Sequence, residues 1–267
     1  TPEKTIEMLT NAKSCALILD QNPKEECFLL KNALKLALNE LNIASFSYPE
    51  NNDTLKYYSE KWSPILKDLV VEQEEKPKAI LKIPKKDILI KELSYNESDD
   101  FFSLIITPKQ GRVIKESFIL EETLPKPDVF LCFFEDMKKL GFLKNEIEVP
   151  ESGENVVMFA SHEEADLGGV KKTLTERITD LIQLLQVNFS PLIADLLFAS
   201  LILETNKFKY YLSKDIFSLT NFLVSRGANS KQISEILESQ RTDSFVQLLG
   251  RAAARTHYDD KLNAMWT

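Results

Sequence analysis

One apolar stretch in the second half of the chain, Ser190 to Lys209, constrains the fold more than any other feature. Ser190 followed by Pro191 predicts the start of a helix, because serine caps a helix N-terminus and proline already has a helical φ. From Leu192 to Leu203 almost every position is apolar, and a helix that is apolar on all sides has to be buried. We therefore expect the central buried helix of an α/β domain. Its far end carries Glu204, which must be either solvated or part of a site, because burying an unpaired carboxylate is costly.

The N-terminal part of the chain follows a strand–helix–strand order. Ser14 to Leu19 is a short continuous apolar run, which is typical of a strand that is buried on both faces. Asn22 and Glu25 flank a proline and predict a helix start, with Asn22 as the cap and Glu25 completing a capping box. Apolar residues spaced three and four apart between Leu30 and Leu41 predict an amphipathic helix. Ala44 to Tyr48 returns as a second strand, so this part is predicted to be a βαβ unit.

The rest of the chain adds strands first and helices afterwards. Apolar runs at 128–134 and 155–160 predict two further buried strands, with a short helix between them that ends at Gly141. After Gly169 the pattern is helical. The expected helix caps are Thr173 with Glu176 as a capping box, Ser190 and Ser213, and Ser230 is expected to start a further helix. The predicted fold class is α/β: a mostly parallel sheet flanked by helices, with a small antiparallel strand insertion and a helix-rich second half.

Residues 76–118 differ in character from both neighbours and are predicted to form the antiparallel insertion. Three strand-like segments, 79–83, 87–91 and 101–106, are joined by polar turns. The insertion also holds the main cluster of lysines in an acidic chain, which either protects a solvated strand edge or binds anions. Its strand edges could also pair two chains into a homodimer. The lysines are Lys76, Lys78, Lys82, Lys85, Lys86 and Lys91.

Charge and residue usage exclude several classes of function. The formal net charge is −8, so long nucleic acid is not expected as a partner. No apolar run reaches membrane-spanning length and no signal peptide precedes Thr1, so neither a membrane partner nor secretion is expected. No glycine precedes Gly111, which excludes a P-loop or Rossmann glycine motif before that position. Cys15, Cys27 and Cys132 show no paired spacing, which predicts reduced thiols and a cytoplasmic location.

Several local phrases resemble the DHH phosphoesterases, the family of RecJ-type exonucleases, oligoribonuclease/pAp phosphatases and manganese pyrophosphatases. Residues 199–208, Ala-Ser-Leu-Ile-Leu-Glu-Thr-Asn-Lys-Phe, resemble the family phrase G-x-x-x-D-T-x-x-F. Residues 226–229, Arg-Gly-Ala-Asn, resemble its helix–Gly-Ala-Asp–helix continuation. Asn22-Pro23 stands where the family has H-x-N-P-D-x-D after the first strand. The resemblance covers 13–250 apart from the insertion, and it implies the α/β fold of this family.

Members of this family use His and Asp side chains to hold two divalent metals, usually manganese, which activate a water and clamp a phosphate. The resemblance places other residue types at the expected ligand positions, so it implies degenerate catalytic motifs. Phe133 has no donor atom, and Lys24 places a cation where a cation would bind. The matching positions are Asp20 for the first His, Lys24 and Glu26 for the two Asp, Phe133 for the middle Asp, Ala160-Ser161-His162 for the DHH triplet and Glu204 for the last Asp.

Two chemical hypotheses follow for this cleft. Asp20, Glu26 and Glu204 supply oxygen ligands that could hold one Mg²⁺ or Ca²⁺ weakly. Alternatively, the Lys24 ammonium replaces the lost metal and neutralises the three carboxylates, so that no cofactor is expected. His162 is either a general base or ligand, or a solvated loop histidine. The predicted site residues are Asp20, Asn22, Lys24, Glu26, His162, Glu204 and Thr205, and the catalytic candidates among them are Asp20, Glu26, His162 and Glu204.

The predicted organisation is a phosphoesterase-like domain over 1–240 and a connecting helix and tail over 241–267, without the second, substrate-binding domain of such phosphoesterases. The first functional hypothesis is a catalytically degenerate binding or scaffold protein, which has a protein partner, forms a homodimer or binds a small anionic nucleotide. Arg251, Arg255 and Tyr258 are expected on a partner face. The alternative is a divergent Mn²⁺- or Mg²⁺-dependent phosphodiesterase or phosphatase that acts on short oligoribonucleotides or small nucleotides.

Overall fold

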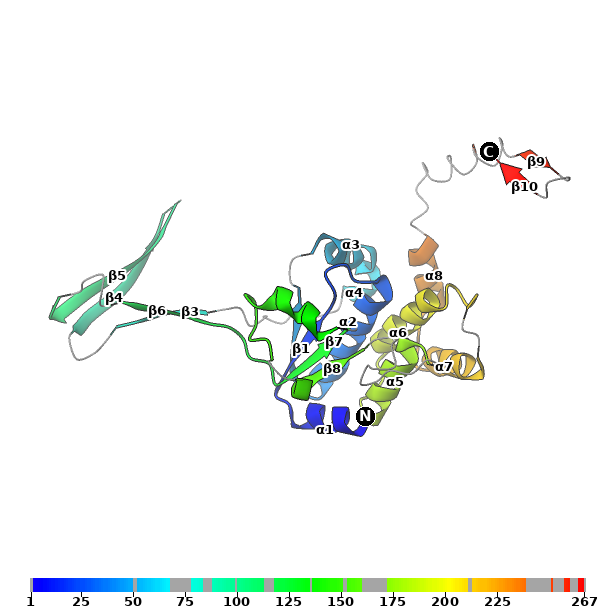
Figure 1. Cartoon of the computed structure of the whole chain (residues 1–267), viewed down its shortest axis with the longest axis horizontal. Helices are drawn as coiled ribbons and strands as arrows, with labels where there is room; N and C mark the ends of the chain where they lie inside the picture. The colour runs from blue at the N-terminus through cyan, green and yellow to red at the C-terminus, as the bar shows by residue number, and fades with distance from the viewer. Residues whose placement is uncertain are drawn as a thin grey trace. The chain divides into compact units, whose positions relative to one another are not determined.

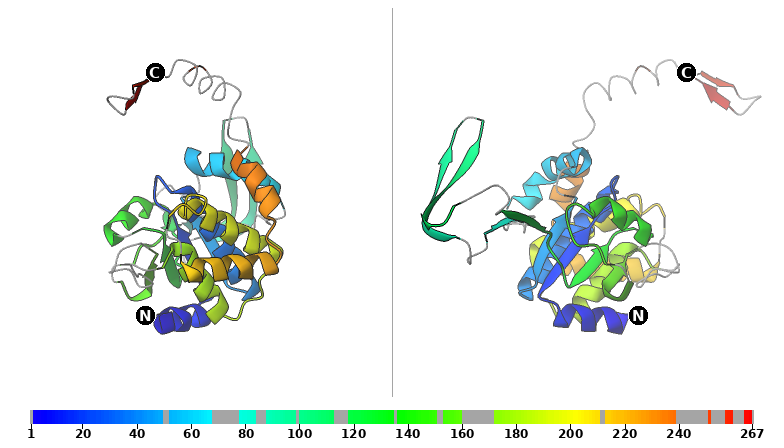
Figure 2. Two further views of the ribbon diagram at one scale, coloured as in Figure 1. Left: turned by 90° about the vertical axis from the view of Figure 1, so that its right-hand side faces the viewer. Right: turned by 60° about the vertical axis from the view of Figure 1, so that its left-hand side comes forward.

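The structure is a computed structural model that divides into two compact units (Figures 1 and 2). Unit 1 comprises 1–72, 128–139 and 152–267, and unit 2 comprises 73–127 and 140–151. The residues that the structure describes are 2–49, 52–67, 78–83, 88–98, 100–112, 118–134, 136–150, 153–159, 172–210, 213–238, 251, 257–259 and 264–266.

Unit 1 contains a four-stranded sheet in which all strands run parallel, in the order β2-β1-β7-β8. β1 (Ser14–Ile18) pairs with β2 (Ala44–Tyr48) on one side and with β7 (Val129–Cys132) on the other. β7 also pairs with β8 (Val156–Met158). All of β7, and β1 from its second residue onward, are buried, as continuous apolar runs predict for strands covered on both faces. The predicted α/β class with a parallel sheet is confirmed.

Helices account for most of the second half of unit 1. α2 (Glu25–Glu40) packs against α6 (Pro191–Glu204), and three other helices from the second half of the chain also contact α6 (Figure 1). Every residue from Leu196 to Ile202 is buried, so the prediction of a central buried helix is confirmed. No helix in the described part of the chain is both long and apolar enough to cross a membrane. The other helices are α1 (Pro2–Asn11), α3 (Asp53–Lys61), α4 (Ser63–Leu66), α5 (Leu174–Leu184), α7 (Lys214–Ser225) and α8 (Ser230–Glu238).

Side-chain caps hold the starts of α5, α6 and α7 where the sequence predicted them. Ser190 Oγ accepts a hydrogen bond from the backbone N–H of Ile193, three residues into the turn. Thr173 and Glu176 form the predicted reciprocal capping box at the start of α5. Ser213 Oγ caps α7 by accepting a hydrogen bond from the backbone N–H of Ile216. Each cap satisfies amide groups that a helix N-terminus leaves without intrahelical partners.

The start of α2 differs from the prediction. α2 begins at Glu25, and its N-cap is Lys24, whose side chain makes no capping hydrogen bond. The predicted capping box of Asn22 and Glu25 is therefore wrong. The physical reason is that the Glu25 carboxylate has other partners: it accepts from Trp62 Nε1 at 2.7 Å and forms an ion pair with Lys61. Local sequence shows a possible cap, but not a competing partner from another helix.

Unit 2 is built from antiparallel ribbons. β3 (Lys78–Lys82) pairs with β6 (Ile119–Thr123), and β4 (Leu89–Glu97) pairs with β5 (Phe102–Gln110). The predicted antiparallel insertion is confirmed, but it extends past residue 118 because β6 pairs with its first strand. Among the described strands, these pairs form two separate two-stranded sheets.

The remaining elements are short. The 3-10 helix η2 (Met137–Leu143) runs through Gly141, so the predicted stop at this glycine is wrong. A second 3-10 helix, η3 (Gly153–Asn155), precedes β8. Near the C-terminus, β9 (His257–Asp259) pairs with β10 (Ala264–Trp266) where only a tail was predicted. Most of the helix predicted at 242–254 lies outside the described residues.

Candidate functional site

The carboxyl ends of the parallel strands meet at one edge of the sheet, which is where open α/β sheets bind ligands. Backbone hydrogen bonds from Leu19 to Tyr48 and from Phe133 to Ile18, each 2.9 Å long, align the chain at the ends of β1, β2 and β7. Asp20 follows β1 directly and lies at this edge. Phe133, the expected position of the middle metal ligand, is buried, with its ring centroid 5.1 Å from that of Phe159. Position 133 therefore belongs to the hydrophobic core.

Glu204, at the end of α6, binds the first turn of α5. Its Oε1 accepts from the backbone N–H of Leu174 at 2.5 Å, and its Oε2 accepts from Thr175 N at 3.0 Å and from Thr175 Oγ1 at 2.8 Å. A helix N-terminus offers such unpaired amides, and its dipole favours a carboxylate. The sequence left solvation and a ligand site as the alternatives for Glu204. The structure instead shows a carboxylate that caps a neighbouring helix.

Burial and hydrogen bonding act in opposite directions on the Glu204 carboxyl group. Desolvation raises its pKa above the ordinary value of 4.5, the hydrogen bonds from Thr175 and Leu174 lower it, and the charge of Glu26 raises it further, with a raised pKa as the result. Two of the predicted site residues, Glu26 and Glu204, thus lie within electrostatic range of each other. Such perturbed carboxyl groups occur both at functional sites and in structural networks.

Two buried hydroxyl groups connect three helices beside Glu204. Thr175 Oγ1 on α5 and Ser200 Oγ on α6 lie 3.0 Å apart. Ser200 Oγ also donates to the backbone carbonyl of Glu26 in the first turn of α2, at 3.4 Å. Because both residues are fully buried, these contacts fix the starts of α2 and α5 against α6. The site is thus supported by rigid elements.

Asp20 is neutralised by a lysine that the sequence did not single out. Lys139 Nζ lies 2.5 Å from Asp20 Oδ2, and the other carboxylate oxygen, Oδ1, accepts from the backbone N–H of Gln21 at 2.7 Å. Lys24, the expected cation, is exposed. Lys139 stands in η2, more than a hundred positions from Asp20 in the chain, so only the sheet topology brings the two together.

Cys27, which the sequence indicated only as a reduced thiol, has a pKa that responds to the charges of four predicted site residues. Burial raises its pKa to about 12, and the charges of Glu26, Glu204 and Asp20 add to this rise while that of Lys24 opposes it. The structure therefore brings these four residues within electrostatic range of one sulfur atom. A thiol with so high a pKa stays protonated at neutral pH and is a poor nucleophile. All three cysteines are free, as predicted.

The other predicted site residues divide into three groups. Thr205 is buried, and its hydroxyl donates to Leu201 O at 2.7 Å and accepts from Phe208 N at 3.1 Å, so it serves the end of α6. Asn22 is exposed next to the cleft residues. His162 and Arg255 lie outside the described residues. Of the expected partner-face residues, Arg251 is exposed and Tyr258 lies in β9.

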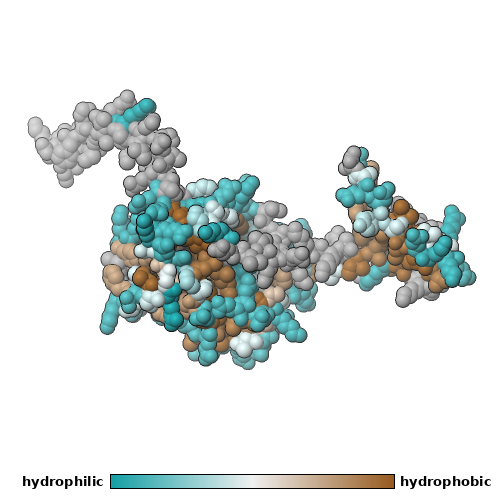
Figure 3. Space-filling model, turned by 180° about the vertical axis from the view of Figure 1, so that it is seen from behind, coloured by the Kyte–Doolittle hydropathy of each residue, from teal (hydrophilic) through white to brown (hydrophobic). Residues whose placement is uncertain are grey.

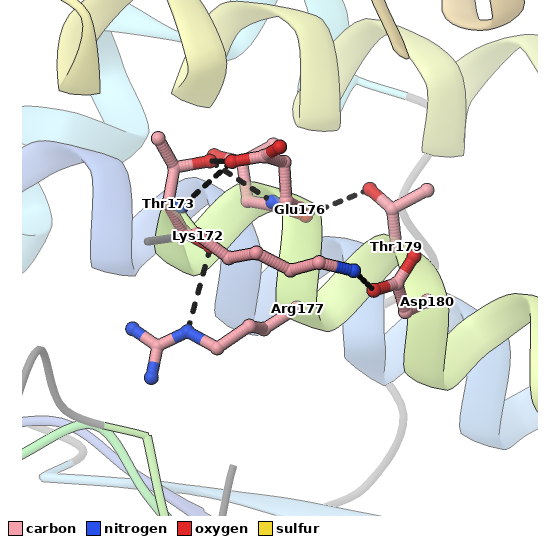
Figure 4. A network of polar contacts seen from close by, with 7 residues as sticks. Lys172, Thr173, Glu176, Arg177, Thr179 and Asp180 are labelled. Carbon is pink, nitrogen blue, oxygen red and sulfur yellow. Dashed lines mark hydrogen bonds and ion pairs between the residues drawn. The ribbon is translucent and has the colours of Figure 1, made fainter. Parts of the chain in front are cut away.

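A polar groove of about 310 Å³ lies along α5 and α7. Lys172 crosses its α5 wall and donates to Asp180 Oδ2 at 2.7 Å, and the hydrogen bond raises the pKa of this lysine (Figure 4).

Arg177, one helical turn after Thr173, donates from Nε to the Thr173 carbonyl at 3.5 Å (Figure 4). Burial lowers the Arg177 pKa, whereas the charges of Glu204 and Glu176 raise it. The sequence does not indicate Arg177 as a neighbour of these carboxylates, because a lone arginine on a helix gives no signal of its charged partners.

The described cleft residues do not fit the pair of divalent ions that the resemblance implies. Two metals need several anionic or imidazole ligands that converge on them. Glu204 instead turns three of its acceptor positions towards α5, Asp20 is paired with Lys139, and Phe133 has no donor. Within the described ranges, no three His, Cys, Asp or Glu side chains lie together as a metal site requires.

No family model matches the chain, and no curated protein matches it. A solved structure is similar, an exopolyphosphatase-related protein from Bacteroides fragilis, with a TM-score of 0.59 and 12% sequence identity. The match covers 98% of this chain and 68% of that one. At this identity the likeness concerns the fold alone. The chain thus shares its fold with this exopolyphosphatase-related protein.

Proposed function

We propose that this chain is a non-catalytic protein on a phosphoesterase scaffold, and that it acts by binding rather than by hydrolysis. The observation that carries the proposal is the Glu204 carboxylate, which stands at the expected last metal-ligand position and accepts three hydrogen bonds from the first turn of α5. A carboxylate that coordinates two metals would have to give up these amides. Leaving buried amide donors unpaired costs about 1–3 kcal/mol each.

Two further positions support the same conclusion. Phe133 packs against Phe159 in the core, so restoring a ligand there would require a buried, unpaired carboxylate, which is strongly unfavourable. Asp20 is held by the ammonium of Lys139, which would repel a divalent ion. Three of the implied ligand positions thus have a structural use that competes with metal binding.

The cleft offers cationic rather than metal-centred recognition. Lys24, at the start of α2, is exposed, and its charge acts on the same thiol as Asp20, Glu26 and Glu204. A small anionic ligand such as a nucleotide would be held there by the Lys24 ammonium, without bond cleavage. A protein partner with an acidic side chain would use the same group.

Manganese titration tests the non-catalytic proposal. We expect no saturable high-affinity Mn²⁺ binding in calorimetry, and no turnover of bis(p-nitrophenyl) phosphate or pApA above that of the Glu204→Gln variant. The matched control is Glu235→Gln, which removes an exposed carboxylate on α8. Hydrolysis that rises with Mn²⁺ and disappears in Glu204→Gln but not in Glu235→Gln would refute the proposal.

The second candidate function is a divergent metal-dependent phosphodiesterase or phosphatase that acts on short oligoribonucleotides or small nucleotides. The observation in its favour is the fold, since the similar solved structure is described as exopolyphosphatase-related. This function requires Glu204 to leave α5 when a metal binds. Mn²⁺-dependent release of the Leu174 and Thr175 amides, seen as faster hydrogen exchange, would support it.

A further inference from the structure

The ribbon of β4 and β5 has one apolar face and one polar face. The cross-strand pairs Leu93–Ile106, Tyr95–Leu104 and Glu97–Phe102 alternate with Ser94–Ile105 and Asn96–Ser103. Since successive side chains point to opposite sides of a ribbon, each set of pairs shares one face. The apolar face consists of Leu93, Tyr95, Phe102, Leu104 and Ile106, with Glu97 at the turn as its one charged member. The polar face consists of Glu92, Ser94, Asn96, Ser103 and Thr107, with Ile105 as its exception.

The apolar face is open to solvent. Its exposed fractions are 71% for Tyr95, 68% for Phe102 and 50% for Leu104. The Tyr95 and Phe102 rings stack at 5.3 Å on the outside of the ribbon, and Figure 3 shows hydrophobic side chains gathered on this unit. An isolated two-stranded ribbon is marginally stable in water. A stable one usually has further strands, or another element packed on its apolar face. Such a face needs an occupant.

Charges of opposite sign lie at the two ends of the ribbon. Glu97 and Asp100 flank its turn. Lys91, Lys109 and Arg112 lie near the opposite end together with the carboxylate of Glu92, so that end keeps a net positive charge. All six residues are exposed. Only an occupant with the reverse arrangement of charges would complement this ribbon along its whole length. The same ribbon turned end to end has that arrangement.

We propose that the apolar face of β4–β5 docks against the same face of a second copy of this chain, with the acidic turn of each ribbon over the basic end of the other. A two-fold axis produces this arrangement directly, because both copies contribute the same patch. It buries the Tyr95 and Phe102 rings and forms both charge contacts at once. An anionic membrane surface would attract the basic end but repel the turn.

This dimer differs from the pairing of strand edges that the lysines of the insertion suggested. Edge pairing uses backbone groups and is indifferent to which face a side chain occupies, whereas face docking depends on the side chains of one face alone. The inference does not rest on the proposed function, because it concerns residues of unit 2 only.

Sedimentation equilibrium of the full chain tests the dimer. We expect a concentration-dependent dimer whose dissociation constant rises by about 100-fold or more in the Tyr95→Glu, Leu104→Glu double variant, because buried aromatic anchors dominate such interfaces. The matched control is Asn96→Glu with Ser103→Glu, which adds the same charge to the polar face of the same two strands and should change the constant by less than about threefold. A monomeric wild-type chain, or equal loss in both variants, overturns the proposal.

Charge reversal gives a second test that does not depend on folding of the face variant. One chain carries Glu97→Lys and Asp100→Lys, and the other carries Lys91→Glu and Lys109→Glu. Each variant alone should be monomeric, because like charges meet at both ends of its dimer. An equal mixture should form heterodimers, since a ribbon with two basic ends then meets a ribbon with two acidic ends and both pairs of ends attract. Homodimers of either variant as strong as wild type, or no association in the mixture, would overturn the antiparallel arrangement.

Discussion

The two units of this protein use similar apolar residues with opposite results. In unit 1, the strands β1 and β7 and the helix α6 carry Leu, Ile and Phe side chains that are almost entirely buried. In the β4–β5 ribbon, side chains of the same kind are about half exposed or more, as at Leu93 and Leu104. The difference lies in what covers each strand. A sheet with helices packed on it removes apolar area from water, and a bare two-stranded ribbon does not.

The polar ends of the elements differ in the same way. In unit 1, the amides at the start of α5 are paired with Glu204 from another helix, and the first turn of α6 is capped by Ser190. In the ribbon, β4 and β5 each have one partner strand among the described residues. Unit 1 thus satisfies the backbone groups of these helix starts internally, whereas the ribbon leaves one edge of each strand to solvent or to another molecule.

The largest contrast should appear on truncating one leucine in each unit. Leu197→Ala, at a fully buried position of α6, should lower the free energy of unfolding by about 2–5 kcal/mol because it leaves a cavity. Leu104→Ala, at a position that is 50% exposed, should change it by less than about 0.5 kcal/mol. Urea denaturation at a concentration where the protein is monomeric measures both. Similar losses would mean that the ribbon is packed within the monomer.

The next largest change in the free energy of unfolding is expected at Glu204, the carboxylate that caps α5. Glu204→Gln should lower the free energy of unfolding by about 1–3 kcal/mol, because an amide NH₂ group then faces the Leu174 and Thr175 donors. The Glu204 pKa is raised, so the folded protein binds this proton more tightly than the unfolded chain does. The stabilisation from protonation is complete below the ordinary pKa of 4.5 and is lost as pH rises through the folded pKa. The gap between wild type and variant should therefore widen on acidification.

Asp128 provides the control of opposite sign for this pH dependence. Its carboxylate accepts from the backbone N–H groups of Lys13 and Ser14, each at 2.9 Å, and the Lys13 bond is the main reason for its lowered pKa. A lowered pKa gives stability that is present above the unfolded pKa and is lost as pH falls through the folded one. The gap between wild type and Asp128→Asn should narrow on acidification. Denaturation curves over a pH series would show whether the two gaps change in opposite directions.

A smaller effect distinguishes the start of α6 from the start of α2. Ser190→Ala should lower the free energy of unfolding by about 1 kcal/mol, because it removes the cap that binds the Ile193 backbone N–H. Lys24→Ala should leave the free energy of unfolding almost unchanged, since the Lys24 side chain caps no amide at the start of α2. Thermal unfolding of the two variants tests this. An equal loss in both would show that Lys24 has a structural use in the cleft.

The smallest effect is expected at the exposed ion pair of the cleft. Lys139→Ala should change the free energy of unfolding by no more than about 1 kcal/mol, because both partners are partly solvated. Added salt should reduce the difference further. A much larger loss, measured by urea denaturation at low and high salt, would indicate that Asp20 is left buried and unpaired.

Much of the fold could be predicted because its signals are local. The Ser190–Pro191 start, the Thr173–Glu176 box and the apolar runs of β1 and β7 depend on residues within a few positions of one another, and each is confirmed. The Asn22–Glu25 box has the same local form and is wrong, because Glu25 binds Trp62 and Lys61 instead. Local rules fail where a residue far away in the chain offers a better partner.

For the candidate site, the sequence suggested residues but not their binding partners. The resemblance placed Asp20, Lys24, Glu26 and Glu204 in one cleft, and the structure brings all four within electrostatic range of Cys27. It did not indicate Lys139 as the partner of Asp20, or the first turn of α5 as the partner of Glu204.

The sequence by itself therefore determined the α/β class, the buried α6 and the antiparallel nature of unit 2, because periodicity and caps are properties of neighbouring residues. Only the tertiary structure decided what the polar groups of the cleft are bound to, and which face of the β4–β5 ribbon remains open. Both depend on contacts between residues that are distant in the chain. The energy of a carboxylate or an apolar face is set by those contacts rather than by its own identity.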